Sequence, residues 1–168
     1  VDDNQHTLYS LIAKGAVAAL GESAWALRLP GLLFGAAGVW AVARLAELAF
    51  GVREALLAAA VLTVSYHDVW FSQNARAYTL LLCVATLATE LLLRALRGGS
   101  WSHWLLYSCA VFTGAFALLT AVLFAVGQAM VTAALLLSGR RPWREWRRPA
   151  VAYALAGWLT LHVYALVI

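Results

Sequence analysis

The sequence predicts an all-α protein, a polytopic bundle of transmembrane helices. Its mean hydropathy is +0.80, and 12% of its 168 residues are charged, about half the share of roughly 25% that is typical of soluble domains. Several apolar stretches reach the length of about 20 residues that a helix needs to cross a bilayer. Their sequences lack the alternation of apolar and polar residues found in membrane β-barrels. Helices are therefore the expected spanning form.

The first expected element is a short helix at the membrane surface. Residues 6–21, HTLYSLIAKGAVAALG, include Lys14 and are too few to cross a bilayer comfortably. Apolar side chains recur at helical spacing along one side of this segment, with polar ones toward another, as an interfacial helix requires. We expect it on the outer surface.

About six candidate spans follow, within one transmembrane domain that takes up residues 1–168. Their ranges are 27–46, 55–71, 77–96, 103–119, 121–138 and 150–168. Residues 103–138 are expected to cross twice, with a re-entrant hairpin as the alternative, because no proline or polar cluster marks a turn. The chain begins at Val1 without Met and is still apolar at Ile168, so we expect a fragment that lacks a first span and a C-terminal part.

The arginines indicate the orientation of these spans. Nine of the twelve basic residues fall in three short connections, around residues 44–53, 94–97 and 140–148. Such a bias marks the cytoplasmic side of a membrane, and it favours a membrane over a nucleic acid as partner. The Ala- and Arg-rich composition suggests a bacterium, hence its plasma (inner) membrane. Glu90 is expected to pair with Arg94 one helical turn away near this inner end.

The same topology places polar residues from two separate loops on the outer face. They are Asp2, Asp3, Asn4, Gln5, His6, Lys14, Glu22, Arg28, His67, Asp68, Gln73, Asn74, Arg76 and Tyr78. Such a set suits transfer chemistry on a phosphorylated lipid. A carboxylate can take a proton from an attacking hydroxyl, and a guanidinium can bind phosphate with two hydrogen bonds.

Structural roles compete with this interpretation. The two acids at the start of the chain could be solvated loop residues, and Asp68 could cap a helix or pair with Arg76. Arg28 could anchor lipid headgroups. The histidines show no metal-ligand spacing. Arg76, beside Tyr78, is the strongest candidate for function because an outer arginine runs against the positive-inside bias.

Four motifs in order resemble those of a known enzyme family. They are HTLYSLIA, ALRLPGLLFG, FGVREALLAAAVL and SYHDVWFSQNARAYTLLL. Over residues 4–97 the chain resembles the N-terminal half of bacterial GT-C-type glycosyltransferases, the RgtA/B/C/D-like and protein O-mannosyltransferase-like membrane enzymes. Beyond residue 97 only the hydropathy pattern is similar.

The resemblance implies a glycosyltransferase that takes a sugar from a polyprenyl-phosphate-linked donor on the outer side of the membrane. It implies an acid in the first outer loop, so Asp2 or Asp3 is the candidate catalytic residue, unless that acid lies upstream. Basic positions near the lipid phosphate correspond to Arg28 and Arg76. His6 and Gln73 are implied to line the pocket, beside Tyr78. No cofactor is predicted, and a divalent metal, the sugar and the acceptor (lipid, polysaccharide or protein) stay open.

Two other classes of membrane protein remain as alternatives. A transporter or flippase-like bundle would use the outer loops to gate or bind a substrate, but such proteins carry ionisable residues or broken helices near the midplane. The middle of these spans is mostly Ala, Leu, Val and Gly. A non-catalytic membrane subunit with the same scaffold is the third possibility.

Overall fold

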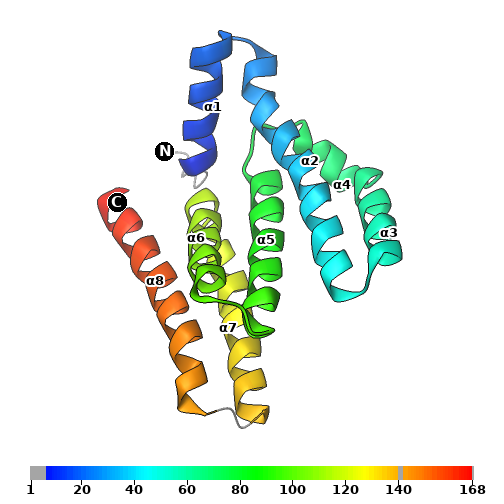
Figure 1. Cartoon of the computed structure of the whole chain (residues 1–168). Helices are drawn as coiled ribbons and strands as arrows, with labels where there is room; N and C mark the ends of the chain where they lie inside the picture. Colours follow the sequence, from blue (N-terminus) through cyan, green and yellow to red (C-terminus); the bar gives the residue numbers. More distant parts are fainter. Residues whose placement is uncertain (1–6, 140–141, 168) are drawn as a thin grey trace.

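A computed structural model describes residues 7–139 and 142–167, and within these ranges the chain is helical, with short connections (Figure 1). The helices are α1 (Thr7–Leu20), α2 (Ala24–Ala49), α3 (Val52–Thr63), α4 (Tyr66–Ser72), α5 (Tyr78–Leu96), α6 (Trp101–Ala117), α7 (Ala121–Ser138) and α8 (Trp143–Val167). From α2 onward the long helices run alternately up and down the bundle. This confirms the all-α helical bundle.

Three described helices, α2, α5 and α7, are long and apolar enough to cross a membrane, and α3 with α4 would make a fourth if the pair is one bent span. Large apolar side chains on these helices face outward. On α3, for example, Leu56, Leu57 and Val61 are each 67% exposed, as expected of lipid-facing positions. That α6 and α8 also cross stays a prediction.

The expected span over residues 55–71 is two helices, α3 and α4, bent by 61°. Near the end of α3, Thr63 Oγ1 donates to the Ala59 carbonyl at 2.8 Å, a bond that often bends helices. Ser65 then adopts an extended conformation with ψ of 122°, and α4 begins at the next residue. After the break, α4 packs against α2.

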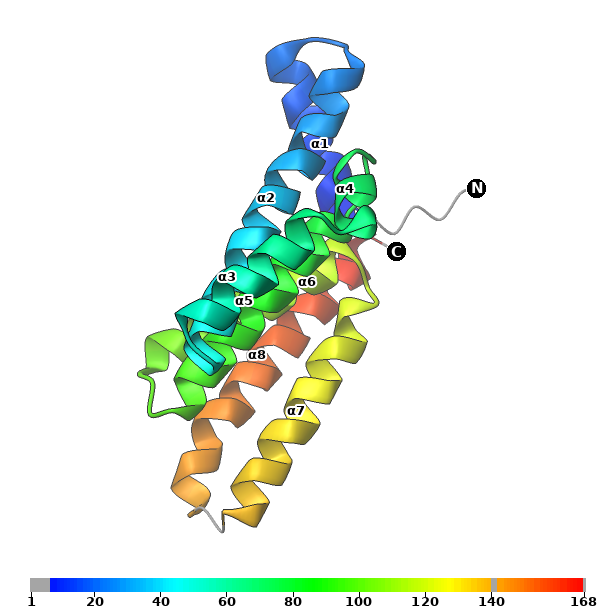
Figure 2. The ribbon, with the colours of Figure 1, turned by 90° about the vertical axis from the view of Figure 1, so that its right-hand side faces the viewer.

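α1 and α2 form an antiparallel hairpin that projects beyond the upper end of α5 (Figures 1 and 2). Gly21, with φ of 87°, follows α1, and Ser23 caps α2 by accepting from the Ala26 N–H at 3.2 Å. The 26 residues of α2 span about 39 Å, more than the roughly 30 Å of a bilayer core. α2 is therefore long enough to extend beyond the bilayer core, and α1 packs beside it. The position of α1 at a membrane interface stays a prediction.

The predicted arginine clusters meet at one end of the bundle, here called the arginine-rich end. Arg97 Nη1 donates to the Leu48 carbonyl at 2.9 Å, which joins the α5–α6 connection to the end of α2. Arg148 Nη1 donates to the Gly99 carbonyl at 3.1 Å, which joins α8 to the same connection. The shared end is thus observed, and its cytoplasmic location stays a prediction.

The predicted pair of Glu90 and Arg94 is confirmed, at 2.7 Å between Arg94 Nη2 and Glu90 Oε1. Arg44 on α2 also reaches the same oxygen, at 3.3 Å. The carboxylate is buried, and the side chains of Arg44 and Arg94 are 43% and 37% exposed, respectively. The cluster therefore ties α2 to α5, with a contribution reduced by solvent screening.

A buried polar network joins the C-terminal helices. Tyr107 Oη on α6 donates to Gln128 Oε1 on α7 at 2.8 Å, and Gln128 Nε2 donates to Thr89 Oγ1 on α5 at 3.0 Å. One turn along α7, Thr132 Oγ1 lies 3.1 Å from the Tyr153 hydroxyl of α8. Side-chain hydrogen bonds of this kind hold helices together where lipid removes the hydrophobic drive for association.

We expect Gln128→Leu to lower the free energy of unfolding by about 1 kcal/mol, because the fully buried Tyr107 hydroxyl loses its acceptor. Adding Tyr107→Phe should recover part of that loss, since no hydroxyl is then left unpaired. Denaturant unfolding of the full-length protein in detergent measures both. Met130→Leu, at an exposed position on the same helix, is the control, and an equal loss in that variant would contradict the prediction.

Candidate functional site

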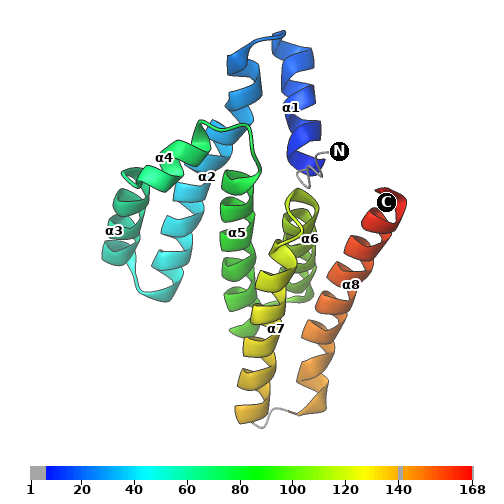
Figure 3. The same ribbon diagram turned by 180° about the vertical axis from the view of Figure 1, so that it is seen from behind.

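The loop of residues 73–77, between α4 and α5, lies at the end of the bundle away from the arginine-rich end (Figure 3). Its backbone is held on both sides of Arg76. The Arg76 N–H donates to the Asn74 carbonyl at 2.8 Å, and Asn74 Nδ2 donates to the Trp70 carbonyl at 2.9 Å. Ala77 is fully buried in a cluster with residues of α1, α5 and α6. The loop is thereby fixed while the Arg76 side chain remains exposed.

α2 approaches this loop through glycine. A Cβ atom at Gly31 would lie 3.0 Å from the Asn74 carbonyl oxygen and 3.2 Å from that of Ser72. One turn further, a Cβ atom at Gly35 would overlap Ser72 Oγ. Small residues four apart permit this close helix contact, and they set the distance between α2 and the loop.

Arg28 and Arg76 are the exposed arginines of this end. Arg28 precedes Gly31 by three residues, so helical geometry puts both on one side of α2, the side against which the loop packs. Neither arginine side chain forms a hydrogen bond or an ion pair with a described residue. Two exposed arginines, one on α2 and one on the loop that packs against it, are thus open to an anionic ligand.

Gln73 and Tyr78 flank the same loop. Gln73 directly follows the last residue of α4 and is exposed. Tyr78 begins α5, is partly buried, and has its ring 4.6 Å from that of Phe71, centroid to centroid. The structure therefore brings three of the predicted residues, Gln73, Arg76 and Tyr78, onto one loop and its borders, with Arg28 on the adjoining helix.

Tyr9 was not among the predicted residues, yet it joins α1 to this region. Its side chain is 2% exposed, and its hydroxyl donates to the Leu27 carbonyl at 3.2 Å. Burial raises its pKa, partly offset by hydrogen bonding to the Gly31 backbone. The hydroxyl therefore stays protonated at neutral pH and remains a donor.

Asp68 follows neither structural alternative weighed from the sequence. Ser65, not Asp68, precedes α4, and no described arginine lies within 4.0 Å of its carboxylate. Asp68 and Ser72 are each 9% exposed and lie on one face of α4. Asp68 Oδ1 is buried and accepts no hydrogen bond from the described residues, so this carboxylate is a further candidate for ligand contact.

Asp2, Asp3 and His6 lie outside the described residues. Their predicted roles as catalytic acid and pocket lining therefore stay predictions. In the part of the chain that the structure describes, no group of three or more His, Cys, Asp or Glu side chains could hold a metal ion.

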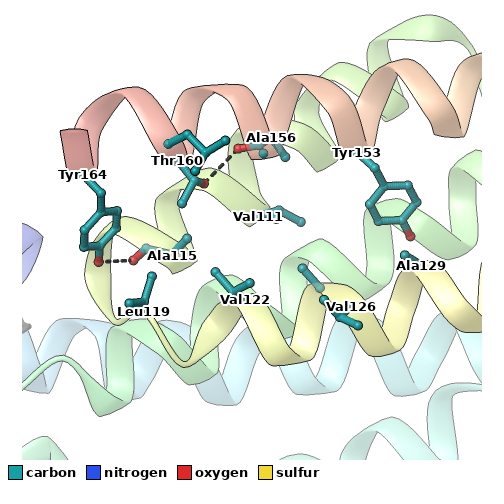
Figure 4. A pocket seen from close by; sticks show the side chains of 13 residues that line it. Val111, Ala115, Leu119, Val122, Val126, Ala129, Tyr153, Ala156, Thr160 and Tyr164 are labelled. Carbon is teal, nitrogen blue, oxygen red and sulfur yellow. Dashed lines mark hydrogen bonds between the residues drawn. The ribbon is translucent and has the colours of Figure 1, made fainter. Parts of the chain in front are cut away.

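A separate cavity of about 540 Å³ lies among α6, α7 and α8 (Figure 4). Val111, Val122, Val126 and Ala129 contribute to its lining, and at one end the Tyr164 hydroxyl donates to the Ala115 carbonyl at 2.9 Å. Because its lining contains no charged side chain, this cavity can hold hydrocarbon but cannot compensate the charge of a phosphate. The exposed cations with no described partner at the other candidate region are Arg28 and Arg76.

A comparison with known protein families found one match. A family model described as dolichyl-phosphate-mannose-protein mannosyltransferase matches residues 6–168. The chain belongs to this family. Neither a curated protein nor a solved structure matches the chain.

Membership of the dolichyl-phosphate-mannose-protein mannosyltransferase family identifies the chain as a mannosyltransferase-like membrane glycosyltransferase. The match extends well past residue 97, where the motif resemblance ended, to include α6, α7 and α8. With the apolar helices already described, it indicates an integral membrane protein.

Sequence reasoning found the arginines of this region but missed the residues that position them. Gly31 and Gly35 were visible as a pair of small residues four apart, a pattern typical of close helix contacts. Tyr9 gave no such signal, since an aromatic residue in an amphipathic helix usually faces an apolar surface. Its contact with Leu27 depends on how α1 folds back on α2.

Proposed function

We propose that this chain is part of an enzyme that transfers a sugar from a polyprenyl-phosphate-linked donor to an acceptor on the outer face of the membrane. The observation that carries the proposal is the placing of Arg28 and Arg76 at one end, exposed and free of described ion pairs. At the other end, Arg44 and Arg94 pair with Glu90. The printed name of the family refers to a lipid-phosphate-linked mannose, which supports a donor of this type.

In the proposed reaction an acceptor hydroxyl attacks the anomeric carbon of the donor sugar. The bond between that carbon and the phosphate oxygen breaks, and polyprenyl phosphate leaves with the electron pair. Arg28 and Arg76 stabilise the negative charge that develops on the phosphate, the kind of oriented electrostatic contact that often contributes most to rate. The hydroxyl proton passes to a carboxylate, for which Asp2 or Asp3 is proposed.

The other predicted residues take binding roles in this proposal. His6, Gln73 and Tyr78 line the sugar or phosphate pocket, and the bilayer holds the polyprenyl chain beside it. Asp68 joins them because its buried Oδ1 has no described donor and can accept a hydrogen bond from a sugar hydroxyl.

A transporter is less well supported. Among the described residues, the buried acidic side chains are those of Asp68 and Glu90. Asp68 lies on α4 beside the candidate site, and Glu90 is paired at the arginine-rich end. The buried groups in the middle of the bundle are uncharged and hydrogen-bonded to each other, which is typical of helix packing.

The sidedness of the proposal can be tested by cysteine labelling. In full-length protein with Cys83 and Cys109 replaced by Ser, we expect Asn74→Cys to react with a membrane-impermeant maleimide in intact cells. Arg53→Cys, on an exposed position of α3 beside the arginine-rich turn, should react only after the cells are opened. Labelling in which residue 74 is protected and residue 53 reacts would refute an outer-face site.

A further inference from the structure

A second cavity, of about 940 Å³, opens at the arginine-rich end, far from the loop of residues 73–77. It lies between the α5–α6 connection, the end of α7 and the start of α8. Among the described residues, three arginines, Arg97, Arg144 and Arg148, line it together with one acid, Glu145. The lining thus carries an excess of positive charge, and the reaction proposed above uses none of these residues.

Two of these arginines are held in place and still have donors to spare. Arg97 uses Nη1 for the Leu48 carbonyl, and Arg148 uses Nη1 for the Gly99 carbonyl. Arg148 also stacks over the Trp101 ring, with its Cζ atom 5.8 Å from the ring centroid. A guanidinium has five N–H donors, so each retains groups that can bind phosphate oxygens with two parallel bonds.

The third arginine, Arg144, makes no side-chain hydrogen bond or ion pair with a described residue. It lies in the first turn of α8, four residues before Arg148, so the two residues lie on the same face of that helix. The next basic residue, Arg147, is exposed and is not part of the cavity lining. The cavity is therefore distinguishable from the general positive charge of this end.

The lining of the cavity also contains apolar side chains. Leu96 on α5, Trp104 on α6, and Leu135 and Leu136 on α7 contribute to it. These belong to helices that pack as a membrane bundle, and Leu135 remains 53% exposed. A lining that combines cationic and apolar side chains matches a molecule with an anionic head and hydrocarbon tails, and it fits a free anion less well.

We propose that this cavity binds the headgroup of an anionic phospholipid from the bilayer. Its phosphate accepts hydrogen bonds from Arg97, Arg144 and Arg148, while the first carbons of its acyl chains lie against Trp104 and Leu135. Basic pockets between transmembrane helices on the positively charged side of a membrane protein commonly recognise such headgroups. The lipid would bridge α5, α7 and α8 at the arginine-rich end, where all three helices line the cavity.

The test uses full-length protein, stripped of lipid in a neutral detergent and titrated with phosphatidylglycerol. Native mass spectrometry measures the bound lipid. We expect Arg144→Gln to weaken binding about fivefold, the equivalent of about 1 kcal/mol for one basic residue near the surface. Arg147→Gln removes the same charge outside the cavity and should leave binding nearly unchanged. Arg144 holds no described contact, so the variant is expected to fold.

Three results would overturn the proposal. Equal weakening in the Arg144 and Arg147 variants would mean general surface attraction, and equally tight binding of phosphatidylcholine would mean that the anionic group is not recognised. Binding of inorganic phosphate to the unchanged protein at millimolar concentration, without binding of phosphatidylglycerol, would identify a free-anion site. The readout is lipid binding, so the outcome is independent of the proposed sugar transfer.

Discussion

Full-length protein carrying Arg76→Ala is expected to transfer sugar from a polyprenyl-phosphate-linked mannose between about 30-fold and 900-fold more slowly than the unchanged protein. The physical reason is the loss of an oriented cation at the leaving phosphate, a contact worth about 2–4 kcal/mol in the transition state by analogy with an oxyanion-hole donor. The measurement is kcat/KM with a labelled lipid donor in detergent or nanodiscs.

Two further variants separate this role from a structural one. Arg76→Lys keeps the charge and loses the planar pair of donors, so we expect it to retain part of the activity. Lys14→Ala removes an exposed cation from α1 and should change turnover little. Since the Arg76 side chain is exposed and makes no described contact, the unfolding temperature should stay unchanged in Arg76→Ala. Unaltered turnover in that variant would remove Arg76 from the site.

Gly35→Ala is expected to lower the free energy of unfolding by about 1–3 kcal/mol, the usual range for overpacking. A Cβ atom at this position would overlap Ser72 Oγ, and it would lie 3.1 Å from Ser72 Cβ. Rotation of the serine side chain moves Oγ but leaves Cβ in place, so α4 must shift away from α2. Thermal unfolding of the full-length protein in detergent measures the loss.

The same variant should also reduce sugar transfer, because Ser72 ends α4 immediately before the loop that carries Arg76. Gly157→Ala is the matched control. It introduces the same methyl group into helix α8 at a position with nothing within 4 Å, where replacing helical Gly by Ala usually stabilises by about 0.5–1 kcal/mol. If the Gly35 and Gly157 variants unfold at the same temperature, the close contact between α2 and α4 is not what holds the loop.

Much of the fold could be predicted because its determinants are local in sequence. The length of each apolar stretch limits where a helix can cross a bilayer, so α2, α5 and α7 lie near their expected ranges. The pair of Glu90 and Arg94 follows from helical spacing alone. The arginines cluster in alternate connections, which predicts that these connections lie at one end of the bundle. The hydrogen bonds of Arg97 and Arg148 join these connections to each other.

The candidate site could be predicted only in part. Arg28, Gln73, Arg76 and Tyr78 were chosen by side-chain chemistry, by the predicted side of the membrane and by the resemblance to a known enzyme family. Their arrangement depends on the bend at Ser65 between α3 and α4. Hydropathy does not predict this bend, because the residues on both sides of it are apolar and hydropathy carries no information about backbone direction. For Asp68, the sequence offered a cap or an ion pair, and the structure instead buries its Oδ1 without a described donor.

The sequence by itself determined that this chain is a helical membrane protein with opposite ends of different charge, since hydropathy and the positions of arginines are properties of single segments. The tertiary structure decided which residues that are distant in sequence lie next to each other. Gly31 meets Asn74 across 43 residues of chain, and Arg97, Arg144 and Arg148 surround one cavity. Such contacts depend on how helices pack, and packing depends on the shapes of surfaces that are distant in sequence.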